Sequence, residues 1–286
     1  MVALLVKFTL FSIMFALGLG LQLGALQQVR QRPALFLRVL VGSCLLVPLA
    51  ALLLLKLPVA QLLSAPGRLA IALMAISPSA PLTLRKAGKQ GGDGELAALL
   101  QVGAAIVAIA SIPLMADLFR TAYGVKGWDI GPAPVALQVA QAQLLPLVLG
   151  LLVRRWQPGL ATRIQGPIDK VANLLLLALF VLVLSKTAPQ LVPFAATNAL
   201  ALAFMALMVV VALAIGFLMA GPDPRERTTT SLVTSMRNPG LALLFAATYA
   251  PQVPGIKLAI LIYLLLTVIL SVPFLRWRKT AVGQVT

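Results

Sequence analysis

The chain contains no histidine and a single cysteine, Cys44, among its 286 residues. These absences exclude an internal disulfide and any metal cluster built from histidine or cysteine side chains. Only seven residues are acidic, and all of them fall in expected loops or near the ends of apolar runs. Without a histidine, an acid at membrane depth or a nucleophile beside a base, the sequence indicates neither an enzyme nor a bound cofactor.

Apolar residues dominate what is present: 60% of the chain is hydrophobic and 10% is charged. In soluble domains, about 45–50% of the residues are apolar and about 25% are charged. The net charge of +16 comes from basic residues spread between apolar runs, and aromatic residues make up only 6% of the chain. That pattern lacks the interleaved aromatic platform of a nucleic-acid binder, so we expect a lipid bilayer and no nucleic acid as partner.

Nine apolar runs are about long enough to cross a bilayer as helices, and we read the first as a retained span rather than a signal peptide. They cover residues 3–26, 34–57, 70–87, 96–119, 135–153, 171–191, 195–220, 228–249 and 256–275. We therefore predict an all-α polytopic membrane protein with nine transmembrane helices, folded as one unit over residues 1–286.

The distribution of lysine and arginine predicts the orientation. With nine crossings, fifteen of these residues fall on one side and seven on the other, and Arg237 lies between the two sides. Because basic residues accumulate in cytoplasmic loops, we expect an external N-terminus and a cytoplasmic C-terminus. The expected location is a bacterial inner membrane or a plasma membrane.

Two of the predicted helices contain breaks. These are Pro78 and Pro81 in the third run, and Pro239 and Gly240 in the eighth. Prolines remove amide donors and free carbonyl groups, which hydrocarbon cannot satisfy unless the backbone lines a polar cavity. Paired interruptions in the two halves of a transporter indicate a substrate site near mid-membrane. The prolines at 48, 113, 146 and 273 are interpreted as ordinary kinks.

Arg237 lies near half-depth of a hydrocarbon core about 30 Å thick, where a charge indicates a functional site. No acid is available at that depth, so its partner is a backbone carbonyl, water or an anionic ligand, and we favour the anion. The expected substrate-binding residues are Arg237, Asn238, Ser79, Thr234, Ser235 and Gln101. Gln138, Gln141 and Gln143 are expected to form interhelical hydrogen bonds.

Several ordered fragments resemble the bile acid:sodium symporter family. They are FALGLGLQLGAL, RQRPALFL, SPSAPL, LLPLVLGLLVRRW and SMRNPGLALLFA. The resemblance implies two inverted repeats that form a panel domain and a core domain, with the third and eighth helices crossing in the core. On that pattern the core comprises the runs at 34–57, 70–87, 96–119, 195–220, 228–249 and 256–275. The panel comprises those at 3–26, 135–153 and 171–191.

The resemblance also implies sodium coupling, but the sodium-binding pattern is changed. The family positions correspond to Ser43, Ala80, Pro81, Val233 and Arg237. The family's glutamate corresponds to Val233, and its glutamine four residues later corresponds to Arg237. Two like charges about 4 Å apart repel by roughly 4 kcal/mol at an effective dielectric near 20, so sodium beside this guanidinium is unfavourable. We hypothesise that Arg237 occupies the space of the lost cation.

The leading functional hypothesis is a secondary transporter of a small organic anion that works by alternating access. A non-transporting sensor or structural subunit, in which Arg237 locks the crossing helices to carbonyls, is the alternative. Arsenite-efflux relatives rely on a core cysteine, whereas Cys44 is placed away from both breaks. Substrate, transport direction, coupling ion and oligomeric state stay open.

Overall fold

The computed structural model describes residues 2–21, 26–78, 91–123 and 132–283, and within these ranges the secondary structure is helical with no strand. The α-helices are α1 (Val2–Gly20), α2 (Leu26–Gln31), α3 (Pro33–Val41), α4 (Val47–Leu55), α5 (Ala65–Ile76), α7 (Gly94–Tyr123), α8 (Pro132–Val139), α9 (Leu145–Trp156), α10 (Pro158–Thr197), α11 (Ala199–Met219), α12 (Pro224–Ser235), α13 (Pro239–Tyr249) and α14 (Ile256–Gly283). The prediction of an all-helical fold is confirmed.

Six helical stretches in the described residues are long and apolar enough to cross a membrane. They are Pro33–Leu55, Gly94–Tyr123, Ala136–Trp156, Pro158–Leu182, Ala199–Met219 and Ile256–Thr280. The stretches Leu4–Gly20 and Ala65–Ile76 are apolar but shorter. The chain is therefore an integral membrane protein by length and composition, while the count of nine crossings and the inverted repeat stay predictions.

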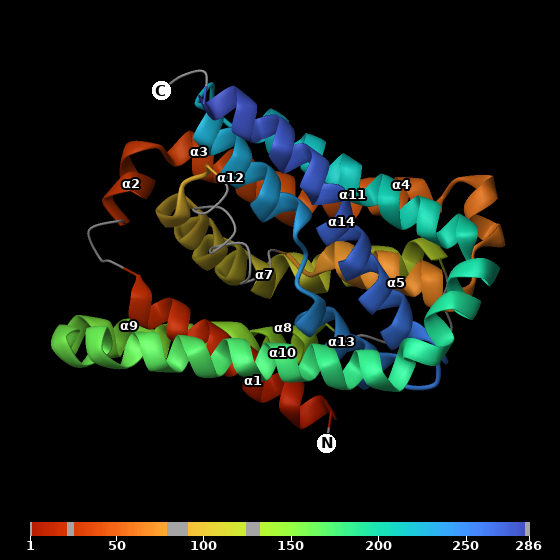
Figure 1. Cartoon of the computed structure of the whole chain (residues 1–286), viewed down its shortest axis with the longest axis horizontal. Coiled ribbons are helices and arrows are strands. Elements are labelled where there is room, and N and C mark those ends of the chain that lie inside the picture. The colour runs from red at the N-terminus through yellow and green to blue at the C-terminus, as the bar shows by residue number, and fades with distance from the viewer. Residues whose placement is uncertain (1, 22–25, 79–90, 124–131, 284–286) are drawn as a thin grey trace.

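The helices form two layers, which are seen edge-on in Figure 1. In one layer α1 packs against both α9 and α10. The other layer contains α3, α4, α5, α7, α11, α12 and α14, and α13 contacts α1 at the boundary between the layers. α10 runs along the horizontal axis of Figure 1, whereas α14 crosses the other layer obliquely and begins near α13. Assignment of the layers to a panel and a core stays a prediction.

Glycines bring two pairs of helices unusually close together. A Cβ atom on Gly150 would lie 2.4 Å from the carbonyl oxygen of Phe15, and one on Gly18 would lie 2.3 Å from that of Leu147. In the second layer, a Cβ on Gly216 would lie 2.6 Å from the Cα of Ser231. Small residues allow membrane helices to approach backbone to backbone, which is the packing seen for α1 with α9 and for α11 with α12.

Two prolines predicted as ordinary kinks follow π-helical turns instead. The turns are η2 (Gly42–Leu46), before Pro48, and η4 (Ala140–Leu144), before Pro146. In η2, the N–H of Val47 bonds the carbonyl of Gly42, five residues earlier. Such wider turns relieve the clash between a proline ring and the carbonyl one turn before it.

The predicted boundaries on either side of α10 are wrong. The sixth helix was expected to begin at residue 171, but α10 begins at Pro158, directly after the single linking residue Gln157, and runs for 40 residues. At 1.5 Å per residue it is about 60 Å long, twice the thickness of a hydrocarbon core. Hydropathy locates the part of a helix inside lipid, so its polar first turns, which include Arg163 and Lys170, were read as loop. Since α10 ends at Thr197, the seventh helix begins at Ala199 rather than at 195.

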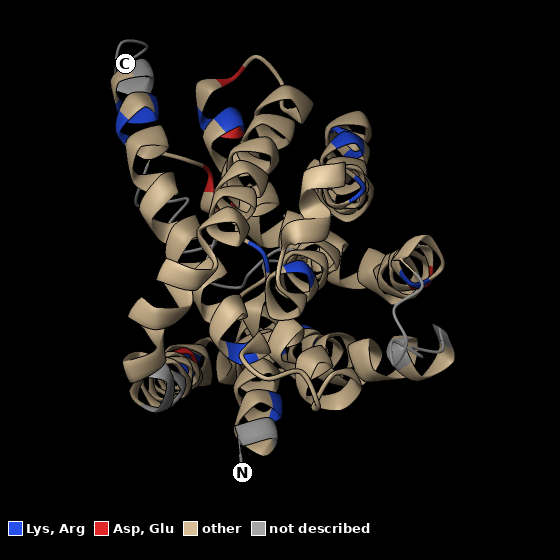
Figure 2. Cartoon of the chain, turned by 90° about the vertical axis from the view of Figure 1, so that its right-hand side faces the viewer, with Lys and Arg blue, Asp and Glu red and all other residues tan. Residues whose placement is uncertain are grey.

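Basic residues lie mainly near helix ends, and acidic residues are few (Figure 2). The start of α12 is held by several of them. Glu226 pairs with Arg32, and Arg278 Nη2 donates to the carbonyl of Pro224 at 2.8 Å. The amide of Asp93, just before α7, donates to Thr229 Oγ1 at 2.7 Å. These contacts tie the first turns of α12 to α3, α7 and α14.

Candidate functional site

The two interrupted helices meet where each of them breaks. α5 ends at Ile76, two residues before Pro78, whose missing N–H cannot continue the helix. α12 ends at Ser235 and α13 begins at Pro239. Between them, the backbone N–H of Asn238 donates to the carbonyl of Ser77 at 3.0 Å. We call this region, comprising Ser43, residues 74–77 and residues 234–238, the crossing site.

The side chain of Arg237 fills the centre of the crossing site and is 1% exposed. Its hydrogen bonds reach five oxygen atoms on three helical segments. Nε donates to Met74 O at 3.1 Å; Nη1 donates to Ser43 O and Oγ, each at 3.0 Å, and to Thr234 O at 3.3 Å; Nη2 donates to Ala75 O. A guanidinium has five N–H groups, so at most one of them, on Nη2, remains for a ligand.

Two prolines explain why these carbonyls are free to accept. The N–H of Val47 bonds Gly42, and the next residue, Pro48, has no N–H, so the carbonyl of Ser43 lacks a helical donor. The α-helical donor to Met74 O would be the N–H of residue 78, which is also a proline, so this carbonyl accepts only the tighter turn bond from the N–H of Ser77 at 3.2 Å and keeps room for a second donor. The sequence therefore creates the acceptors on η2 and α5 that Arg237 binds.

Electrostatics favour a cation in this position. The last carbonyls of α5 carry the partial negative charge of a helix C-terminus, and the guanidinium lies against them. No group of three or more acidic, histidine or cysteine side chains that could hold a metal ion occurs in the described residues. Val233, at the expected position of the family's glutamate, is buried in a hydrophobic cluster with α1 and α3 residues.

The other predicted site residues on α12 and α13 are buried beside Arg237. Asn238 caps α13, because its Oδ1 accepts from the N–H of Leu241 at 3.1 Å, while its Nδ2 is buried without a partner in the described structure. Thr234 likewise has a buried Oγ1 with no described partner. The hydroxyl of Ser235 donates to Leu232 O at 3.4 Å. Two of these side chains therefore retain hydrogen-bonding capacity.

The remaining predicted residues lie elsewhere or outside the described ranges. Gln101 is buried on α7, a helix that packs against η2. Ser79, Ala80 and Pro81 fall outside the described residues. Cys44 directly follows Ser43 in η2, so the expectation that it lies away from both breaks is wrong. Hydropathy gives the order of the helices along the chain but not which helix packs against a break.

Sequence reasoning missed two polar groups and identified one interhelical bond. Ser231 Oγ and the Tyr263 hydroxyl are buried with no partner among the described residues. Gln143 was expected to form an interhelical hydrogen bond, but its Nε2 is buried with no partner among the described residues. Hydroxyls and amides can bond their own helix, so composition alone did not distinguish these from satisfied groups. Gln138 Nε2 donates to Thr248 Oγ1 at 3.3 Å, between α8 and α13, as predicted for the glutamines.

The groups gathered at the crossing site are hydrogen-bonding and charged groups. It contains a permanently charged group on carbonyl acceptors, unpartnered hydroxyl and amide groups, and the N-terminus of α13 just beyond Asn238. A helix N-terminus and unpaired donors favour an anion. No side-chain nucleophile there is paired with a general base.

Comparison with known proteins gives one family. The sequence model of the Sodium Bile acid symporter family matches residues 7–194, about two thirds of the chain. The match includes α5 and η2 but ends before α12 and α13. The search of curated proteins gives no match.

Proposed function

Because the chain belongs to the sodium bile acid symporter family, we propose that it is a secondary transporter of a small organic anion in which Arg237 replaces the coupling sodium ion. The family supports a membrane transporter rather than an enzyme. The substrate class and the loss of sodium binding are inferred from the residues of the crossing site.

The observation that carries the proposal is the set of oxygen atoms around Arg237. Two of the five are the carbonyl and hydroxyl oxygens of Ser43, and one is the carbonyl of Thr234. The other two are the carbonyls of Met74 and Ala75, in the last turn of α5. Sodium is a hard cation that prefers such oxygen ligands, by the same logic as calcium. Here these oxygens already bind a positive charge that belongs to the chain.

The substrate would be held mainly beside Arg237, because at most one of its N–H groups, on Nη2, is left for a ligand. Asn238 Nδ2 and Thr234 Oγ1, on the residue after Arg237 and three residues before it, supply unpartnered groups. The positive charge of Arg237 and the N-terminus of α13 would attract the anionic group electrostatically. Ser79, Ser235 and Gln101 remain proposed contributors.

Alternating access would follow from movement between the two layers. Within one layer, the hydrogen bond from Asn238 to Ser77 and the contacts of Arg237 hold both broken helices together. The boundary with α1 and α10 is formed by α13 and α14. A rigid unit that carries the site past a second layer is the usual way in which such transporters expose a site to each side in turn.

Uptake into proteoliposomes tests the proposal. The purified chain would be assayed with a panel of radiolabelled small carboxylates and sulfonates, in sodium buffer and in choline buffer of equal ionic strength. We expect saturable uptake of at least one anion, with the same rate in both buffers. Uptake that rises steeply with sodium and saturates would refute the replacement of sodium by Arg237.

The alternative is a sensor or structural subunit, in which the same carbonyl contacts only lock the helices. Binding without transport would distinguish it. An anion that stabilises the chain against heat, yet is neither accumulated nor exchanged by proteoliposomes, would support the alternative over the transporter.

A further inference from the structure

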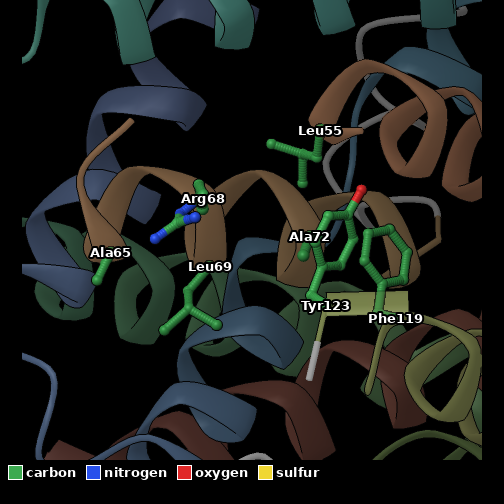
Figure 3. Close-up of a pocket in the computed structure, with 7 residues that line it drawn as sticks. All are labelled: Leu55, Ala65, Arg68, Leu69, Ala72, Phe119 and Tyr123. Carbon is green, nitrogen blue, oxygen red and sulfur yellow. The ribbon is translucent and has the colours of Figure 1, made fainter. Parts of the chain in front are cut away.

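A cavity lies beside the first two turns of α5, before the part of this helix that enters the crossing site. Its volume is about 230 Å³. It is partly open and lies between the end of α4, the first half of α5 and the end of α7 (Figure 3). Its lining residues are Leu55, Ala65, Arg68, Leu69, Ala72, Phe119 and Tyr123. At 1.5 Å per residue, Arg68 is about 9 Å along α5 from Met74, so this cavity is separate from the crossing site.

The walls of the cavity are apolar. Phe119 and Tyr123 stack with their ring centres 6.0 Å apart, and Figure 3 shows them across from Leu69 and Ala72 of α5. The hydroxyl of Tyr123 donates to Leu52 O at 2.5 Å, so this polar atom is already engaged. What the tyrosine contributes to the cavity is mainly its ring, which suits an apolar ligand.

Arg68 is the only charged residue in the lining. Its side chain has no hydrogen-bond or ion-pair partner among the described residues, whereas Arg120, at the end of α7, pairs with Asp117 at 2.6 Å. Asp117 is therefore occupied by another cation. Arg68 also lies in the first turn of α5, where the positive end of the helix dipole makes a cation unfavourable. An anion at this point would be attracted by both.

We propose that this cavity binds an amphipathic monoanion, with the anionic group on Arg68 and an apolar chain between Leu69, Ala72 and Phe119. The volume holds about seven groups of the size of a water molecule, at roughly 30 Å³ each. That is enough for a carboxylate with a short hydrocarbon chain. The same chemistry is offered by a free medium-chain carboxylate and by the phosphate and upper acyl chain of an anionic lipid.

The cavity shares no residue with the crossing site. A ligand bound in it would contact α4, α5 and α7 where these helices meet. A ligand there would fix the start of α5, whose far end supplies the carbonyls that hold Arg237. Its occupancy should therefore stabilise the fold without requiring transport. This inference does not depend on the function proposed above.

Thermal unfolding of the full chain in zwitterionic nanodiscs tests the site with octanoate as the probe and octanol as its uncharged match. We expect octanoate to raise the unfolding temperature saturably and octanol to have a much smaller effect. Arg68→Gln should weaken the octanoate response about tenfold or more, as expected for the loss of a charge-assisted contact. Ala72→Leu, which keeps the charge but fills the cavity, should weaken it too. Arg38→Gln, on exposed α3 surface, should leave it unchanged.

A parallel series in nanodiscs that contain phosphatidylglycerol separates the two ligand sources. If phosphatidylglycerol stabilises the wild type but not Arg68→Gln, while octanoate has no effect on either, that result would identify a lipid as the natural occupant. If Arg68→Gln will not fold, Arg68→Lys and Ala72→Leu still decide the question. An equal octanoate response in the wild type and in Ala72→Leu, or no stabilisation by either octanoate or phosphatidylglycerol, would overturn the proposal.

Discussion

Nη1 of Arg237 donates to both the carbonyl and the hydroxyl oxygen of Ser43, each at 3.0 Å, across 194 residues of sequence. This contact joins the π turn before Pro48 to the break between α12 and α13. It makes Arg237 part of the packing of the core as well as of the candidate site.

Replacing Arg237 should destabilise the fold strongly. Arg237→Ala removes the described donors to Ser43 O and Ala75 O and leaves Met74 O with only the N–H of Ser77, at 3.2 Å, and each buried group left unpaired costs about 1–3 kcal/mol. We expect the free energy of unfolding to fall by about 3 kcal/mol or more, measured by thermal or denaturant unfolding in detergent. Arg237→Lys, which keeps the charge and three donors, should lose less. Arg38→Ala, on an exposed surface, is the control, and equal stability of Arg237→Ala and wild type would contradict the prediction.

Restoring the family's pattern should restore sodium binding. The double variant Val233→Glu with Arg237→Gln places a carboxylate and a neutral amide beside the oxygens of Ser43, Met74 and Thr234. We expect sodium to raise the unfolding temperature of the double variant. At a sodium concentration of one hundred times Kd, the free energy of unfolding should rise by about 2.7 kcal/mol. Potassium should have a much smaller effect.

Each single variant serves as a control for the double variant. Val233→Glu retains the guanidinium of Arg237, so we expect the new carboxylate to pair with Arg237 rather than with sodium. Arg237→Gln alone supplies no carboxylate. Sodium stabilisation of the wild type comparable to that of the double variant would show that Arg237 does not exclude the ion.

Asn238 should have two separable roles, in capping and in substrate binding. Asn238→Ala removes the cap of α13 and should cost about 1 kcal/mol of stability. Asn238→Ser keeps a capping oxygen but removes the unpartnered Nδ2. We therefore expect Asn238→Ser to unfold close to wild type but to take up the substrate anion more slowly in proteoliposomes. Equal uptake by Asn238→Ser and wild type would exclude Nδ2 from substrate binding.

The contact between α1 and α9 should tolerate no side chain at Gly150. A Cβ there would lie 2.4 Å from Phe15 O, which forces the two backbones apart. Overpacking of this kind costs about 1–3 kcal/mol, so Gly150→Ala should lower thermal stability measurably. Gly159→Ala is the matched control, because nothing lies within 4 Å of its Cβ position. Similar unfolding temperatures for both variants would mean that the helices separate at no cost.

The sequence predicted the class of fold and the position of the breaks because both depend on local chemistry. Apolar runs and missing proline N–H groups act within one helix, so their effects are readable from neighbouring residues. The possible acceptors of Arg237 were also limited by composition, since no acid lies at its depth. Carbonyls were therefore among the expected partners.

The identity of those carbonyls could not be predicted in the same way. Ser43 lies 194 residues from Arg237, and its carbonyl is free only because the π turn and Pro48 remove two helical donors at once. The length of α10 was missed for a different reason. A helix continues through polar residues outside the bilayer, whereas hydropathy reports only where lipid is preferred.

The covalent attachment of Arg237 has an energetic consequence for the proposed carrier. A bound sodium ion adds its charge to the substrate's and lets an inside-negative membrane potential pull both inward. A cation that belongs to the chain cannot be released on either side, so in a complete cycle only the substrate carries net charge across. For a monoanion, a potential of 100 mV then favours outward movement by about 2.3 kcal/mol. Accumulation inside the cell would require exchange for another anion or co-transport of a proton, and export would require neither.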